Sequence, residues 1–419
     1  MARHPFAFAL TALSLAFHTA AFADSDGDRE RDRNKDRTVT VDCASGETVA
    51  RALTRGDDRK SLTILINGTC SENVVINRSD VKVAAAVPGA TLVGPDGALD
   101  VIRVTGSRVT IDGIAVTGGR NGIVADGAAG LIVQNALVQG TGRTGIAYQH
   151  GASGIMDNVT VKGNARDGIA VDAASAAIIN SLITQNTRHG IGVFTNGSAR
   201  IGLDNLNVPG GNTVSANGAN GININFGSGA LIAMNTVTGN GTITAPGNPQ
   251  NGIGLNSATA DLIGGNTISG NTGQGINLRM SSLSVGDTSF GFTSVNTITG
   301  NGNTAAPGGI FAFLGSAINM QNAVISSNNG FGMVLSLRSQ AQIAGTTIQN
   351  NVPVGTNPGD GIRLAFGSGV FAATPVGSVT GNAGFGINCT DGESSVVNTG
   401  SLGIGPNTFG GVAPSCTGF

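Results

Sequence analysis

Apolar and polar residues alternate along most of this chain in short runs, the pattern of β-strands with one buried face. The segment from Asn158 to Val171 illustrates it, because Val159 and Val161 alternate with polar residues before Gly168 begins the next apolar run. The runs are short, rich in β-branched residues and interrupted by glycine or asparagine. They therefore indicate strands joined by tight turns rather than helices.

A glycine followed by isoleucine, or once by methionine, recurs eleven times, and the shortest intervals are 22–23 residues. The glycines are Gly122, Gly145, Gly168, Gly190, Gly221, Gly252, Gly275, Gly309, Gly332, Gly361 and Gly386. So short a unit cannot enclose its own apolar face and has to stack on its neighbours. The predicted fold is an all-β, right-handed parallel β-helix of 22–23-residue coils with small capped ends, since parallel crossovers are almost always right-handed.

Within each glycine–isoleucine strand, the isoleucine and the residue two positions later share the inward face. This places Tyr148 in the core and leaves an outward column that begins Asp126, Gln149, Asp172, Phe194 and Asn225. Asparagines mark the predicted turns, where they tolerate left-handed backbone and can form ladders between coils. One asparagine register includes Asn164, Asn186 and Asn217, and a second includes Asn135, Asn158, Asn180, Asn235, Asn266, Asn296 and Asn322.

The ends of the chain have different compositions. Residues 1–23 are predicted to be a signal peptide, with an apolar run over Phe6–Phe17 and a small-x-small site at Ala21–Ala23. Residues 24–37 are predicted to be a charged, disordered leader. Residues 38–100 are predicted to form an N-terminal cap with the first coils, 101–388 the solenoid and 389–419 a C-terminal cap. No segment is long and apolar enough to span a membrane. We expect a secreted or periplasmic protein.

Four cysteines in an exported chain indicate two disulfides. Three pairings are possible, and Cys43–Cys70 with Cys389–Cys416 is favoured because each pair brackets one end of the solenoid with the same separation of 27 residues. The net charge of −2 argues against nucleic acid as a partner.

Four arginines stand two residues before successive anchoring glycines, although only 13 basic residues follow position 60. They are Arg120, Arg143, Arg166 and Arg188. Stacked about 4.8 Å apart, they would repel one another. The repulsion between their positive charges must be offset by nearby carboxylates, from Asp126, Asp167 or Asp172, or by an anionic ligand. Arginine suits the carboxylate or sulfate of a polysaccharide. The alternative is a solvated ladder that prevents lateral aggregation.

Beside this register, Asp126 and Asp172 lie two coils apart, roughly 9–10 Å by strand spacing. That separation approaches the one used by inverting glycosidases, with His150 or His189 as proton carrier. Gln149, His189 and Asn225 are expected to contact substrate with the arginines. Alternatively, the two aspartates could hold Ca²⁺ while an arginine abstracts a proton in a β-elimination. No other cofactor is predicted.

The glycine–isoleucine repeat over about residues 100–388 resembles the pectate-lyase-like right-handed parallel β-helix superfamily, and the segment Ile66–Ile76 is similar to the opening of many exported bacterial β-helix proteins. The resemblance implies a substrate groove on the outer face of one sheet, walled by long turns. Here the corresponding insertions are Gly241–Asn251, Gly302–Gly308 and Val352–Asp360, with another around Asp204–Gly211.

The chain lacks the Asp-Pro-His-Asp motif of the superfamily's alginate epimerases, and it lacks the motifs of its polygalacturonases and pectate lyases. Two functions remain open. The first is binding or processing of an acidic polysaccharide by hydrolysis, elimination or epimerisation. The second is a non-catalytic adhesin, envelope scaffold or glycan-binding rod. Whether the protein is an enzyme is left open.

Overall fold

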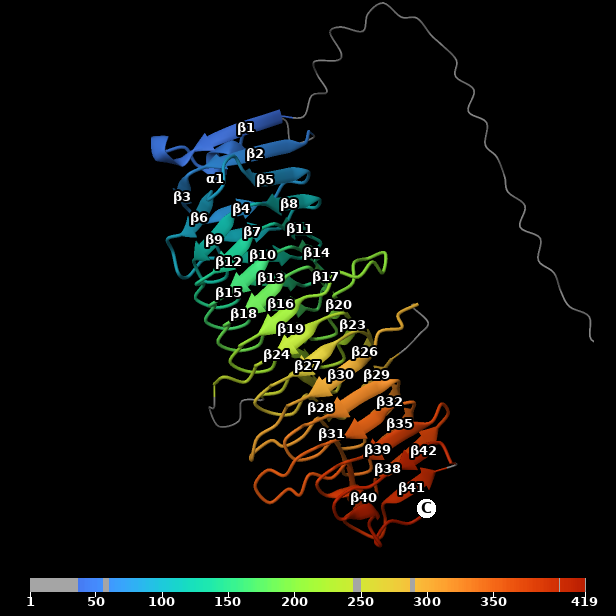
Figure 1. Cartoon of the computed structure of the whole chain (residues 1–419). Helices are drawn as coiled ribbons and strands as arrows, with labels where there is room; N and C mark the ends of the chain where they lie inside the picture. The colour runs from blue at the N-terminus through green and yellow to red at the C-terminus, as the bar shows by residue number, and fades with distance from the viewer. Residues whose placement is uncertain (1–36, 56–59, 244–249, 287–290, 399, 419) are drawn as a thin grey trace, which may run out of the picture. The chain divides into compact units, whose positions relative to one another are not determined.

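The computed structural model describes residues 37–55, 60–243, 250–286, 291–398 and 400–418. The chain divides into Met1–Asp36 and Arg37–Phe419, so the predicted signal peptide and nearly all of the charged leader lie outside the described residues. The second unit is a right-handed parallel β-helix, as predicted. Each coil contributes one strand in turn to three parallel sheets, here called A, B and C, and the strands of each sheet stack along the solenoid (Figure 1).

Sheet A has 15 strands within the described residues, and each pairs in parallel with the strand one coil away. In stacking order they are β1 (Arg37–Asp42), β2 (Leu62–Asn67), β5 (Val81–Ala85), β8 (Val109–Asp112), β11 (Gly130–Gln134), β14 (Ser153–Asp157), β17 (Ser175–Ile179), β20 (Ser198–Ile201), β23 (Gly229–Ala233), β26 (Thr259–Gly264), β29 (Ser282–Val285), β32 (Ala317–Gln321), β35 (Gln340–Ala344), β38 (Gly369–Ala373) and β41 (Ser395–Asn398).

Sheet B follows sheet A along each coil and has 14 short strands in the described part of the chain. They are β3 (Thr69–Ser71), β6 (Thr91–Gly94), β9 (Ala115–Gly118), β12 (Leu137–Gln139), β15 (Thr160–Lys162), β18 (Leu182–Thr184), β21 (Thr213–Ser215), β24 (Thr236–Thr238), β27 (Thr267–Ser269), β30 (Asn296–Thr299), β33 (Ala323–Ser326), β36 (Thr347–Gln349), β39 (Gly377–Thr380) and β42 (Leu402–Ile404).

Sheet C contains the predicted glycine–isoleucine strands, and the structure describes 14 strands in it. They are β4 (Val74–Ile76), β7 (Ile102–Val104), β10 (Ile123–Asp126), β13 (Ile146–Gln149), β16 (Ile169–Asp172), β19 (Ile191–Phe194), β22 (Ile222–Asn225), β25 (Ile253–Asn256), β28 (Ile276–Arg279), β31 (Ile310–Phe313), β34 (Met333–Leu335), β37 (Ile362–Leu364), β40 (Phe385–Cys389) and β43 (Gly410–Val412). Stacked strands thus extend beyond 101–388 at both ends.

The N-terminal end is closed by the 3-10 turn η2 (Cys43–Ser45) and the helix α1 (Val49–Leu53). Thr48 caps α1 by accepting a hydrogen bond from the Arg51 amide, and Val49 is buried against the core. Both predicted disulfides, Cys43–Cys70 and Cys389–Cys416, are present, one at each end of the solenoid. Among the described helices, none could span a lipid bilayer.

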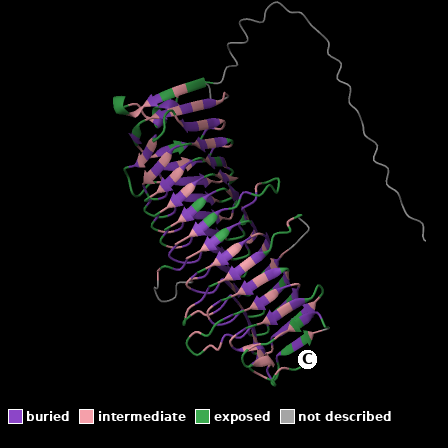
Figure 2. Cartoon of the chain, viewed as in Figure 1, coloured by how far each residue is buried: buried purple, intermediate pink, exposed green. Residues whose placement is uncertain are grey.

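The inward columns make one continuous apolar core along the solenoid, visible as the alternating buried and less buried bands of the strands (Figure 2). Ile146, Ile169 and Ile191 are fully buried and stack in register on consecutive coils of sheet C. Tyr148 is also fully buried, as predicted, and its hydroxyl donates to the Leu131 carbonyl at 2.9 Å. The polar atom of this ring is therefore satisfied inside the core.

A buried asparagine ladder lines the corner between sheets B and C. In each step one side-chain amide donates to the side-chain oxygen of the next, as from Asn186 to Asn217 at 3.0 Å. The ladder runs through Asn164, Asn186, Asn217, Asn240, Asn271, Asn301, Asn328, Asn351, Asn382 and Asn407. This confirms the first predicted asparagine register.

The second predicted register combines two different positions of the corner between sheets A and B. Asn135, Asn158 and Asn180 are exposed residues with positive φ, whereas Asn235 and Asn266 lie one position further along and form a buried ladder. Serines form a third ladder at the corner between sheets C and A, where Ser339 Oγ accepts from the Ser316 amide at 3.1 Å. The sequence analysis did not identify this serine column.

The anchoring glycines are required by close packing rather than by unusual φ. A Cβ atom on Gly168 would lie 2.6 Å from the Asn186 side-chain nitrogen and 2.7 Å from the Gly190 carbonyl oxygen. Gly145 is confined in the same way by Val161 and Asn164. The ladder asparagine of one coil therefore occupies the space that a side chain on the previous coil's glycine would need.

Asn217→Ala should lower the free energy of unfolding by about 3 kcal/mol, because it leaves several buried groups without partners. Asn217 bonds with Asn186, Asn240 and the Ile183 carbonyl. The matched control is Asn158→Gly, which removes an exposed amide where φ is positive and should change stability by less than about 0.5 kcal/mol. Chemical denaturation measures both, and equal losses would contradict a special role for the buried ladder.

Candidate functional site

The outward face of sheet C carries the predicted functional column in register. Asp126 pairs with Gln149, Gln149 with Asp172, and Asp172 with Phe194 on consecutive coils. Val124, Ala147 and Ala170 form a second, apolar column on the same face, against which Phe194 packs. The face thus combines an apolar strip with a row of polar side chains.

The four arginines stack at the corner between sheets B and C, beside this face. The Arg166 amide donates to the Arg143 carbonyl, and the Arg188 amide donates to the Arg166 carbonyl, so the three backbones are in register. Their side chains form one wall of a cleft of about 380 Å³. The cleft is lined by Arg120, Asn121, Arg143, Thr144, Gln149, Arg166, Asp167, Ala170, Asp172, Arg188, His189, Phe194, Thr195, Asn223, Asn225 and Phe226. Eight of the predicted site residues therefore meet in one place.

Asp167 is the carboxylate that compensates part of the arginine charge. It is buried, and it accepts hydrogen bonds from Arg188 through both oxygens, a bidentate pair that fixes the guanidinium. Arg166 lies 4.0 Å from the same carboxylate. Arg188 also lies over the Phe194 ring, 5.4 Å from its centroid. The Arg188 guanidinium is consequently fixed by the Asp167 carboxylate and by the Phe194 ring.

The other arginines are less fully compensated. Arg120 lies 4.0 Å from Asp100, and Arg143 has no ion-pair partner among the described residues. Burial, followed by the charge of Arg188, lowers the pKa of Arg166, with a smaller contribution from Arg143. The lining residues include four arginines but only two aspartates, Asp167 and Asp172. The cleft therefore keeps a net positive charge that an anion would stabilise.

His189 lies beside Asp167 at the bottom of the cleft. Only 6% of its surface is exposed, and its Nδ1 has no hydrogen-bond partner among the described residues. Burial lowers the pKa of His189 to about 4, although Asp167 acts in the opposite direction. The ring is therefore neutral at pH 7, and a ligand group could use its unpaired nitrogen.

Asp126 and His150 do not line the arginine cleft, although Asp126 was expected there together with Asp172 and with His150 or His189 as proton carrier. Asp126 accepts a hydrogen bond from Arg103 on the previous coil, and His150 Nδ1 lies 2.7 Å from its other oxygen. The His150 side chain is exposed, and its backbone has a positive φ of 53°. The hydrogen bond with His150, with the charge of Arg103, lowers the pKa of Asp126.

The same contacts bear on the expected calcium site. Both oxygens of Asp126 are taken by Arg103 and His150, so this carboxylate is not available to a hard cation shared with Asp172. Within the described ranges, His, Cys, Asp and Glu form no cluster of three or more that could hold a metal ion. The residues do not fit the calcium hypothesis.

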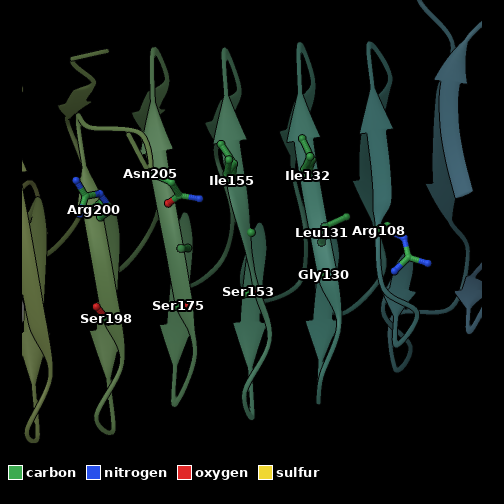
Figure 3. Close-up of a pocket in the computed structure, with 12 residues that line it drawn as sticks. Arg108, Gly130, Leu131, Ile132, Ser153, Ile155, Ser175, Ser198, Arg200 and Asn205 are labelled. Carbon is green, nitrogen blue, oxygen red and sulfur yellow. The ribbon is translucent and has the colours of Figure 1, made fainter. Parts of the chain in front are cut away.

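A second groove lies on sheet A, bounded by Arg108 and Arg200 with a row of serines between them (Figure 3). Its volume is about 340 Å³, and its floor includes Ile132 and Ile155. Both arginines have partners, because Arg108 pairs with Asp80 and Arg200 donates to the Asp204 carbonyl at 2.8 Å. In the sheet A groove, Arg108 is therefore neutralised by a carboxylate, and the Arg200 guanidinium is engaged by the Asp204 carbonyl and the Asn207 side chain.

Within the described residues, no part of the insertions lines the arginine cleft, contrary to the expectation. The turn around Asp204–Gly211 contributes Asn205 to the sheet A groove, while Gly302–Gly308 and Val352–Asp360 fold into their own short bridges. Part of Gly241–Asn251 lies outside the described residues. Phe226, an exposed residue at the edge of the cleft with φ of 57°, was not predicted from the sequence. Its position directly after Asn225 in the outward column was the available signal.

His189 should make the stability of the protein depend on pH. Its folded pKa of about 4 is below the ordinary 6.5, so between these values the unfolded chain binds a proton that the folded chain does not. The free energy of unfolding should fall by roughly 3 kcal/mol as the pH drops through this range, with no further loss from this group below it. Denaturation from pH 7 to 4 would test this. His189→Gln should remove that part of the slope, and parallel curves for both proteins would contradict it.

Comparisons with known proteins support the architecture. The profile of the family described as right-handed β-helix region matches residues 69–207 and 279–401. The crystal structure of the periplasmic alginate epimerase AlgG superposes with a TM-score of 0.50 at 12% identity, over 80% of this chain and 84% of that chain. The crystal structure of pectate lyase Pel9A gives a TM-score of 0.42 at 15% identity, over 70% of this chain and 80% of that chain.

The A-module of the Azotobacter vinelandii mannuronan C-5 epimerase AlgE6 gives a TM-score of 0.42 at 13% identity, over 88% of this chain and 91% of the module. No curated protein matches the sequence significantly. At 12% identity the likeness to the alginate epimerase AlgG shows the fold and no more. Because the profile covers more than half of the sequence, and because three parallel sheets wind around one continuous core, this chain belongs to the right-handed β-helix family.

Proposed function

We propose that this protein is exported and that its arginine cleft binds an acidic polysaccharide. The observation that carries the proposal is the uncompensated charge of the stacked arginines, above all Arg143, in a cleft that also contains the buried, neutral His189. Planar guanidinium groups repeated on successive coils match carboxylates or sulfates repeated along a chain. A solvated ladder with no ligand accounts less well for an unpaired nitrogen buried at the base of the cleft.

Two further features agree with a linear glycan. The cleft follows the stacking direction of the strands across several coils, so a polymer could lie along it. Phe194 and Phe226 offer ring surfaces at its edge, and aromatic rings pack against the C–H faces of sugars. The two disulfides favour an oxidising compartment, which agrees with the predicted signal peptide and with a secreted or periplasmic location.

The cleft also contains groups that could process the glycan. Asp172 lines it and has no hydrogen bond or ion pair with another side chain in the described residues. Asp172 is therefore the better candidate for general acid or base chemistry, with His189 as a hydrogen-bonding neighbour. Asp126 and His150 form a separate pair next to the cleft and are the alternative. Neutralisation of a uronate carboxylate by Arg143 and Arg166 would favour proton abstraction at the adjacent carbon, the first step of elimination or epimerisation.

Binding is tested by changing Arg143 and Arg166 to alanine together. We expect retention on polygalacturonate and alginate in affinity electrophoresis to fall by at least about tenfold and to become less sensitive to salt, because two charge-assisted contacts are lost. The matched control changes Arg108 and Arg200, which removes the same charge from the sheet A groove and should leave retention unchanged. Equal retention of the wild type and the Arg143/Arg166 variant would assign the arginines a structural role.

Processing is tested by comparing Asp172→Asn with Asp126→Asn. If the protein turns over an acidic polysaccharide, Asp172→Asn should fold normally and lose about a hundredfold or more in rate, the usual scale for a general acid or base. Asp126→Asn should keep most of the activity. The reverse pattern would move the chemistry to the Asp126–His150 pair. No turnover by the wild type, together with retained binding, would favour a non-catalytic glycan-binding solenoid.

A further inference from the structure

The outward face of sheet C changes character beyond the arginine cleft. On β22, β25 and β28 the arginines give way to asparagines around a second cavity of about 350 Å³. This cavity is lined by Asn220, Asn223, Asn225, Asn251, Gly254, Leu255, Asn256, Asn277 and Arg279. Asn223 and Asn225 line both cavities, so the two are continuous along the sheet. One charged residue, Arg279, is found among the described lining residues, and it is exposed.

In this cavity on sheet C, one side-chain amide atom of Asn223 and one of Asn256 are buried without a hydrogen-bond partner in the described residues. Asn223 is 4% exposed, and its Nδ2 has no hydrogen-bond partner among the described residues, although its oxygen accepts from Asn220 at 3.0 Å. The Oδ1 of Asn256 is likewise buried and unpaired within the described chain. Buried polar groups are nearly always hydrogen-bonded, so an unpaired donor and an unpaired acceptor in one cavity call for an explanation.

The neighbouring asparagines do not share this property. The Asn220 oxygen accepts from the backbone amide of Asn251 at 2.9 Å, and the Asn251 oxygen accepts from the Gln274 amide at 3.1 Å. These residues continue the buried polar column in which Asp167 and His189 stand one position before the anchoring glycine. Asn220 and Asn251 therefore stabilise the corner, whereas Asn223 and Asn256 project from the strands onto the outer face. The fold does not use their free amide atoms.

The register brings these amides together beside a glycine. Asn223 pairs with Gly254 on the next coil, and Asn225 pairs with Asn256. A Cβ atom on Gly254 would lie 2.2 Å from the Asn220 side-chain nitrogen, so a side chain there would displace the amides. Two coils beyond Asn256, Phe311 and Phe313 project from the same face with ring centroids 5.2 Å apart. Sheet C therefore presents cationic groups, then amides, then aromatic rings, in the direction of stacking.

We propose that this amide cavity is a second subsite that binds an uncharged sugar residue of the same glycan through Asn223 Nδ2 and Asn256 Oδ1. The proposal rests on the proposed function, because it assumes that the arginine cleft holds the acidic residues. Sugar hydroxyls donate and accept hydrogen bonds, so adjacent hydroxyls satisfy both amide atoms once the two side chains rotate to expose these atoms, which are buried in the free protein. An acetamido group on the sugar would do the same. The preferred glycan is then a heteropolysaccharide that combines acidic with neutral or N-acetylated residues, rather than a uniform polyuronate.

The experiment compares the wild type with an Asn223→Ala and Asn256→Ala double variant. Calorimetric titration would use three probes: hyaluronan octasaccharide, which alternates glucuronate with N-acetylglucosamine; trigalacturonate, which is acidic and short; and cellohexaose, which is neutral. We expect the double variant to lose about tenfold or more in affinity for the hyaluronan oligosaccharide, the effect of losing one or two hydrogen bonds. Its affinity for trigalacturonate should fall less than that for hyaluronan, because the arginines are unchanged, and Asn256→Ala alone, at a residue outside the arginine cleft, should leave this affinity within about twofold.

Two controls separate binding from stability. Asn319 and Gln342 are exposed amides that pair on the outer face of sheet A, and changing both to alanine should leave every affinity unchanged. Asn256→Ala alone removes an oxygen that has no partner, so its Tm should be unchanged or higher while the affinity for hyaluronan falls. If the Asn256 amide instead stabilised the fold, the Asn256→Ala variant would have a lower Tm than the wild type.

The outcomes distinguish the two proposals. If the double variant binds hyaluronan as tightly as the wild type, the amide subsite is wrong even when the arginine cleft binds trigalacturonate. If the wild type binds cellohexaose but neither acidic probe, and the double variant loses that binding, the amide subsite stands and the acidic function fails. If Asn256→Ala lowers the Tm and leaves binding unchanged, the amide has a structural role and the subsite is overturned.

Discussion

The contact between each anchoring glycine and the asparagine ladder is the constraint on which the rest of the structure depends. The ladder satisfies buried backbone groups at the corner between sheets B and C, and it fits only because the neighbouring glycine has no side chain. A larger residue at Gly168 would push on the Asn186 amide and on the next coil's backbone at once. The same contact recurs on coils of 22 residues, as at Gly168, and of 31 residues, as at Gly190, so it keeps the apolar columns in register whatever the length of the turns.

The arginine cleft follows from this constraint. On the arginine-bearing coils that have a ladder asparagine, three residues separate it from the glycine, as Ala165, Arg166 and Asp167 do between Asn164 and Gly168. Both ends of that segment are fixed, so its middle residue always leaves the corner in the same direction and its last residue is always buried. The middle residue, Arg166 or Arg188, carries the positive charge. The last residue, Asp167 or His189, is buried beneath it. A cationic cleft therefore needs only arginine at the middle position of consecutive coils.

Features that recur on every coil could be predicted from the sequence. Features that depend on one particular side-chain contact could not. The coil length, the inward columns, Tyr148 and both disulfides follow from spacing, and spacing also predicted that the arginines share one cleft with Gln149, Asp172, His189 and Asn225. It could not show that Arg103 on the preceding coil binds Asp126 and removes it from that cleft, because β7 lies outside the recognised glycine repeat. Turn propensity also failed at the corner after sheet C, where Phe226, Met280 and Phe366 adopt positive φ although glycine or asparagine would be favoured there.

A solenoid separates stability from specificity more completely than a globular fold does. The ladders and inward columns of neighbouring coils are nearly the same, so the outward positions of sheet C can change with little effect on folding. The arginine column ends where Ala219 replaces Arg188 one coil later, yet the ladder continues through Asn217 to Asn240 without interruption. Polar atoms left unpaired beside sheet C, such as Asn223 Nδ2 on the outer face and His189 Nδ1 at the corner, lower stability without serving the coil. Their retention on adjacent coils is most simply explained by a ligand that lies along sheet C and pairs with them.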